Sequence, residues 1–173
     1  MSNLLKTKKM KKVLKVILVI VIMAFIAIQF IRPAKNSGEE IAANQITAKY
    51  QIPPEVEQIL KVSCYDCHSN TTHYPWYSNI QPVAWWLDDH IVEGKDELNF
   101  STFMEYPVWR QYKKFKEIGK EVKEGEMPME SYTFIHRDAV MTADQKSLVQ
   151  TWVANTMKEM ESEYPAKSLK KPK

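Results

Sequence analysis

The sequence predicts an all-α protein, and three observations support this fold class. Only four glycines occur among 173 residues, which argues against a turn-rich all-β design. No stretch alternates apolar and polar residues as a half-buried strand does, whereas several stretches repeat apolar residues at helical spacing. The composition, 45% hydrophobic and 26% charged, is that of a folded chain. At this length we expect one domain with appendages.

The chain begins with a basic segment, residues 1–12, and continues with an apolar one, residues 13–31. Six lysines and no acidic side chain occur in the first fifteen residues: Lys6, Lys8, Lys9, Lys11, Lys12 and Lys15. The apolar range is close to the ~20 residues that cross a bilayer. We predict a single-pass anchor in the cytoplasmic (inner) membrane, with its basic flank in the cytoplasm and the rest in the periplasm. A cleaved signal peptide is the alternative.

The remaining charge excludes one class of function. Without the six lysines, 18 of the 24 basic side chains remain against 21 acidic ones, so this part carries about −3. A nucleic-acid-binding domain needs a basic face on its folded part. We therefore expect no nucleic-acid partner. Residues 32–52 are polar and weakly patterned, and we interpret them as a linker.

Four helices are expected after the linker. The first follows Pro53 and Pro54, which suit a first helical turn, and ends near residue 64. The second spans residues 82–94, where Gly94 is expected to end it. The third spans residues 107–124, because the proline that follows in "GEMPME" cannot continue a helix.

The fourth helix has the clearest start signal. Thr142 and Gln145 match a capping box, and apolar residues follow at helical spacing as far as Met160. Residues 161–173 are then a basic tail. No internal repeat and no glycine-rich phosphate loop occurs. We predict a small helical bundle.

Cys64 and Cys67 are the only cysteines of the chain, and His68 directly follows them. A redox dithiol needs such a pair at the start of a helix in an α/β unit. A structural zinc site needs a second pair of ligands, which the scattered histidines do not supply. A disulfide leaves His68 without a role. Haem attachment uses all three residues, so we predict one covalent haem c with His68 as the proximal iron ligand.

The second axial position of the iron has several candidates. Met127 lies in "GEMPME", where a following proline holds it in a loop between two helices, and it is the predicted distal ligand. Met129 is the adjacent alternative. His90 on the apolar face of the second helix and His73 in an aromatic loop are further ones. The order of motif helix, Met-Pro loop and terminal helix resembles a class I cytochrome c.

A wider resemblance covers roughly residues 50 to 155. The stretches "CYDCHSNTTHYPWYSNIQPVAWWLDDHIVEGKDELNFSTF" and "GEMPMESYTFIHRDAVMTADQKSLVQTW" resemble the haem-binding domain family of bacterial c-type cytochromes. The resemblance implies Cys64 and Cys67 as thioether positions, His68 as an axial ligand, and Met127 as the most cytochrome-like distal position. We assign residues 53–160 to a cytochrome c-like haem-binding domain on this basis.

The expected function is single-electron transfer on the periplasmic side by a membrane-anchored monohaem c-type cytochrome. Such a protein is an electron carrier and not an enzyme, although its haem leaves room for peroxidase-like activity. The alternatives are a haem-based sensor or peroxidase-like protein with an open distal site, and a non-haem interaction domain held by a disulfide. The expected partners are the membrane, through the N-terminal helix, and redox proteins that the sequence does not identify.

Overall fold

The computed structural model describes residues 2–172, and the side chains of residues 9–172. Within this part of the chain there is no β-strand, and a single isolated bridge joins Ser37 to Thr71. The all-α prediction is confirmed. The α-helices are α1 (Ser2–Ile28), α2 (Pro54–Ser63), α3 (Tyr65–His68), α4 (Val83–Glu97), α5 (Val108–Glu124), α6 (Glu130–Ile135) and α7 (Ala143–Glu163). Short 3-10 helices connect them: η1 (Ala42–Asn44), η2 (Ile46–Ala48), η3 (Trp76–Asn79), η4 (Phe100–Glu105) and η5 (Arg137–Ala139).

The chain forms two compact units. One comprises the residues up to Lys35 together with Tyr74–Asp89, and the other comprises Asn36–His73 and the chain from His90 onward. The boundary between them falls inside α4. The larger unit contains the cysteine motif and all the helices that follow α4.

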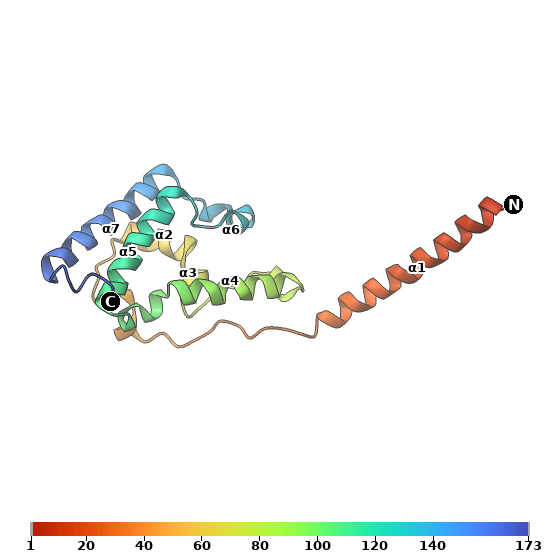
Figure 1. Ribbon diagram of the computed structural model, residues 1–173, viewed down its shortest axis with the longest axis horizontal. Coiled ribbons are helices and arrows are strands. Elements are labelled where there is room, and N and C mark those ends of the chain that lie inside the picture. The colour runs from red at the N-terminus through yellow and green to blue at the C-terminus, as the bar shows by residue number, and fades with distance from the viewer. Residues whose placement is uncertain (1, 173) are drawn as a thin grey trace. The chain divides into compact units, whose positions relative to one another are not determined.

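The core of the larger unit lies between α5, α7 and α2. Helices α5 and α7 run side by side, and α2 packs against α7 (Figure 1). Phe115 of α5 is fully buried at the centre, with ring centroids 4.9 Å from Tyr50, 5.2 Å from Phe103 and 5.6 Å from Trp152. These edge-to-face contacts add to the apolar area that the four rings bury.

The ends of the two long helices have identifiable causes. Helix α5 follows Pro107 and ends at Gly125, whose φ of 81° lies in the left-handed region that glycine adopts without strain. Helix α7 starts at the predicted capping box. The Thr142 hydroxyl accepts a hydrogen bond from the Gln145 backbone N–H, and the Gln145 side chain accepts one from the Thr142 N–H.

The smaller unit is organised around Gln81, which is fully buried. Its backbone N–H donates to Gln29 Oε1 at 2.9 Å, and its side-chain amide donates to the Ile31 carbonyl at 2.7 Å. The Trp85 indole N–H donates to the same carbonyl at 3.0 Å. The residues after the C-terminal end of α1 are therefore held against the start of α4.

The prediction of a transmembrane anchor at residues 13–31 is wrong. Within residues 2–172, no helix combines the length and the apolar character needed to cross a membrane. The uninterrupted apolar stretch of α1, Val16 to Ile28, covers about 20 Å of helix, shorter than the ~30 Å of a hydrocarbon core. The predicted location in the cytoplasmic membrane with a periplasmic haem domain is corrected with it.

Residues 32–52, predicted as a linker, contribute to the core. Ile46 and Tyr50 are 2% and 6% exposed, and both belong to the main apolar cluster. The Tyr50 hydroxyl donates to Gln111 Oε1 at 2.6 Å, and the carbonyl of Gln51 accepts from the Trp152 indole N–H at 3.0 Å. This segment therefore packs against α5 and α7.

Candidate functional site

The cysteine motif is one helical turn at the end of α2. Cys64 caps α2, and α3 continues directly from it to His68. The Cys64 carbonyl accepts hydrogen bonds from the backbone N–H of Cys67 at 3.2 Å and of His68 at 3.0 Å. Because the backbone is fixed in this turn, the two thiols and the imidazole come from one short rigid segment.

The His68 ring is oriented through one nitrogen. Nδ1 lies 2.8 Å from the Gly94 carbonyl oxygen and 3.0 Å from that of Leu98. A carbonyl oxygen only accepts, so Nδ1 carries the proton and Nε2 presents its lone pair. Metal-binding histidines are held in this way by an outer hydrogen bond. Burial also lowers the pKa of His68, which keeps the imidazole neutral and able to bind a metal.

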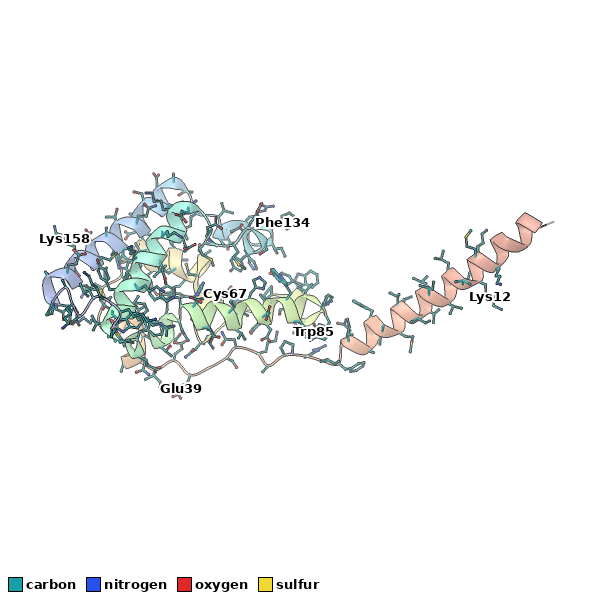
Figure 2. All side chains as sticks on the ribbon, viewed as in Figure 1. Lys12, Glu39, Cys67, Trp85, Phe134 and Lys158 are labelled. Carbon is teal, nitrogen blue, oxygen red and sulfur yellow. The ribbon has the colours of Figure 1, made fainter. Side chains whose placement is uncertain are left out.

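Gly94 permits the close packing of α4 against the motif. A Cβ at this position would lie 2.8 Å from the Cys67 carbonyl oxygen, a distance that real Cβ atoms do not tolerate. Helix α4 does not end at Gly94 as predicted. It continues to Glu97, and the Leu98 N–H donates to the Gly94 carbonyl at 2.9 Å. Figure 2 shows Cys67 beside α4.

Two neighbouring cavities adjoin the motif. The smaller one, about 220 Å³, is lined by both cysteines, His68 and the loop between α5 and α6. The larger one, about 390 Å³, continues from Cys64 and His68 over the apolar side chains of Leu98, Phe100, Ile118 and Val122. Both cavities include Met127 in their walls. A largely apolar space with a few oriented polar groups is typical of a cofactor site.

The structure brings together three of the four candidates for the distal position. Met127, Met129 and His90 all line the smaller cavity with His68. His73 is exposed and is not among the lining residues; its backbone N–H donates to Asp66 Oδ1 at 2.9 Å. That one of these three side chains binds an iron together with His68 stays a prediction.

The two thiols are free, and their surroundings disfavour redox chemistry. Burial is the largest cause of the raised pKa of Cys64, about 12, and of Cys67, about 11. A reactive dithiol needs the opposite shift. Among the residues that the structure describes, no group of three or more His, Cys, Asp or Glu side chains could hold a metal ion, so they offer no zinc site.

Tyr132 is a site residue that the sequence analysis missed. It lines the smaller cavity, and its hydroxyl donates to Asp66 Oδ2 at 3.0 Å. Burial and the Asp66 carboxylate raise the pKa of Tyr132, so the phenol stays protonated. Its ring stacks on His136 at a centroid distance of 4.3 Å. In the sequence, the nearness of Tyr132 to the Met-Pro loop, five residues after Met127, is the signal that could have indicated its place in the site.

The comparison with known families agrees with this geometry. The profile of the haem-binding domain family matches residues 23–155, which include the motif, both cavities and the Met-Pro loop. The chain belongs to the haem-binding domain family. No curated protein and no solved structure matches it.

The residues of this haem-binding domain fit the group that its family binds. The imidazole of His68 offers Nε2 to an iron, while the apolar walls of the two cavities suit a porphyrin ring. The two thiols come from the same helical turn as that imidazole. The residues present therefore agree in type and position with haem as the cofactor.

Proposed function

We propose that this haem-binding protein is a monohaem c-type cytochrome that carries single electrons and is not an enzyme. The observation that supports it most directly is the position of His68. Its Nδ1 is held by two carbonyl oxygens, and it lines one cavity together with Cys64, Cys67 and Met127. When bound, the haem supplies one-electron exchange between its ferric and ferrous forms.

Covalent attachment is assigned to Cys64 and Cys67. In that role each thiol would add across a vinyl group of the haem, with one carbon–sulfur bond formed and the thiol proton placed on the other vinyl carbon. No oxidant is needed for this addition. Burial raises the pKa of both thiols, which lowers their thiolate fraction and slows disulfide exchange before attachment.

His68 and Met127 are the two side chains that would hold the iron of a bound haem. The fixed tautomer of His68 leaves Nε2 as its only iron-binding atom. The Met127 thioether would favour the reduced form of a bound haem and would give it a higher potential than a second histidine would. Two firm protein ligands also leave no open position for substrate, which is what an electron carrier needs. Its partner is then another redox protein, and no nucleic acid is involved.

An absorption spectrum of correctly matured protein tests the attachment. The protein is produced in a host with haem c maturation machinery, and the haem is then extracted with acid-acetone. We expect the haem to stay with the protein, and each of C64A and C67A to give a spectrum of pyridine-treated haem with one thioether instead of two. Complete extraction from the wild-type protein would exclude covalent attachment.

Carbon monoxide distinguishes the carrier from the sensor or peroxidase-like alternative. A ferrous haem with His68 and Met127 firmly bound should react with carbon monoxide slowly, because a ligand must first leave. Rapid and complete binding by the wild-type protein would instead indicate an open distal position and would contradict the electron-carrier proposal.

A further inference from the structure

A buried lysine lines the larger cavity beside the proposed haem site. Lys114 of α5 is only 5% exposed, and it shares the cavity wall with His68 and Met127. Lysine is almost never fully buried unless it is paired, because an ammonium loses strong hydration when it leaves water. The position of this charge therefore needs an explanation.

Two carboxylates pair with Lys114. Its Nζ lies 2.8 Å from Glu117 Oε2 and 3.2 Å from Glu97 Oε2. Glu117 is on the same helix, but Glu97 is the last residue of α4. The next residue, Leu98, provides one of the two carbonyl oxygens that hold His68 Nδ1. The charge of Lys114 is therefore fixed next to the segment that orients the histidine.

Lys114 differs from the other charged residues of this cavity wall, which are Glu97, Glu117, Lys120 and Glu121. The Lys120 side chain is 59% exposed, so solvent screens its charge, and it also pairs with Glu121. The Lys114 side chain is 6% exposed, and a buried charge is screened far less by water and salt. Among the charged residues of this wall, Lys114 is the buried cation.

We propose that Lys114 sets the reduction potential of the haem bound at His68, by keeping a positive charge in the cavity wall against its acidic neighbours. The inference rests on the proposed function, because it requires a redox-active haem at that position. Reduction adds one electron to the iron centre and lowers its positive charge. A fixed cation nearby favours that change, so Lys114 raises the potential.

The test compares two substitutions that should shift the potential in opposite directions, which separates an effect of charge from an effect of packing. Lys114→Met removes the charge and keeps an unbranched apolar side chain of similar length, so the potential should fall. Glu97→Gln removes a negative charge that pairs with Lys114. The Glu97 side chain is 75% exposed, so solvent screens part of its charge, and the potential should rise by less than it falls in Lys114→Met. If loosening of the site were the cause, both substitutions would shift the potential in the same direction.

The chain offers a matched control in Lys113. This neighbouring lysine pairs with the same Glu117 at 3.0 Å, but its side chain is 58% exposed. The midpoint potentials of matured wild type, K114M, K114R, E97Q and K113M are measured by spectroscopic redox titration at constant pH and salt. We expect K114M below wild type, E97Q above it, and K114R and K113M close to it.

The possible failures are distinguishable. An unchanged potential in K114M, or a shift of K114M and E97Q in the same direction, would overturn the role of Lys114 while the haem protein stays intact. If K114M does not take up haem, the test rests on the midpoint potential of E97Q. A potential above that of wild type supports the inference, and a potential equal to that of K113M overturns it. Wild-type protein without haem would instead overturn the proposed function, and this inference with it.

Discussion

Gly94 lies so close to Cys67 that a Cβ added to it would be 2.8 Å from the Cys67 carbonyl oxygen, so only glycine lets α4 pack this closely against the haem motif. We expect Gly94→Ala to push α4 away and to move both carbonyl oxygens that hold His68. The overpacking should cost about 1–3 kcal/mol, more than the ~1 kcal/mol that alanine gains in a helix. Denaturant unfolding and haem content of matured protein measure the two effects.

Gly119→Ala is the matched control for that substitution. A Cβ at Gly119 in α5 would meet a methyl group of Val153 at 3.2 Å, and a side-chain methyl group can shift more easily than backbone can. We expect little change in stability and full haem content. If Gly94→Ala behaves like Gly119→Ala, the close approach of α4 does not matter for haem binding.

The two methionines of the Met-Pro loop make different predictions. Met127 and Met129 both line the smaller cavity, but only Met127 also lines the larger one. Met127→Ala should abolish the sulfur-to-iron charge-transfer band of the oxidised protein and lower its potential, because a thioether favours reduced iron. Met129→Ala should keep the band. The reverse result would make Met129 the ligand, and a wild-type protein without the band would direct attention to His90.

The raised thiol pKa values predict slow alkylation of the protein before haem attachment. At pH 8 a pKa of about 11 leaves about one Cys67 in a thousand ionised, and Cys64, with a pKa of about 12, is ionised about ten times less. Reaction with iodoacetamide should accelerate about tenfold per pH unit between pH 8 and 10, since the thiolate is the nucleophile. Mass spectrometry of protein made without maturation machinery gives the rate.

Unfolding in guanidinium provides the control for thiol reactivity, because it should restore the rate of an ordinary exposed cysteine. Rapid alkylation of folded protein at pH 7 would show a low thiol pKa and would favour a reactive dithiol. Circular dichroism of the same sample confirms that the helices are present during the reaction.

Tyr50 tests whether the segment before α2 is part of the folded domain. Tyr50→Ala should cost about 3–5 kcal/mol, because it removes a ring that packs on Phe103 and Phe115. Tyr50→Phe keeps the ring but leaves Gln111 Oε1 without its donor, at about 1–3 kcal/mol. Phe134→Ala, at a side chain that is 69% exposed, should change the free energy of unfolding by less than about 0.5 kcal/mol.

The long helices were predictable because their signals are local. The proline of the Met-Pro loop bounded α5, apolar spacing located α7, and the capping box at Thr142 fixed the start of α7 to the residue. The short helices η4 and α6 carry no such periodicity. Ile46 and Tyr50 were hidden in a polar segment, where two buried residues do not make a pattern. The burial of Tyr50 depends on Phe103, Gln111 and Phe115, which are more than fifty residues away.

The candidate site was predictable only where side chains determine it. Two cysteines and a histidine at fixed spacing identify the motif, and a methionine before a proline marks the facing loop. The two acceptors of His68 Nδ1 are backbone atoms, which no residue type encodes. Gly94 was expected to end a helix because glycine often does so. Its role in packing α4 against Cys67 is a tertiary contact, which the sequence does not show. No sequence pattern separates Lys114 from the exposed lysines, because its burial comes from tertiary packing.

The hydrogen bonds at Gly94 connect local unfolding to the state of the iron ligand. The Gly94 carbonyl accepts from both the Leu98 N–H, at 2.9 Å, and His68 Nδ1, at 2.8 Å. Opening the last turn of α4 therefore loosens the histidine at the same time. Amide hydrogen exchange at Leu98 should report how often the imidazole is released, and conditions that protect this amide should also slow the exchange of His68 for an external ligand.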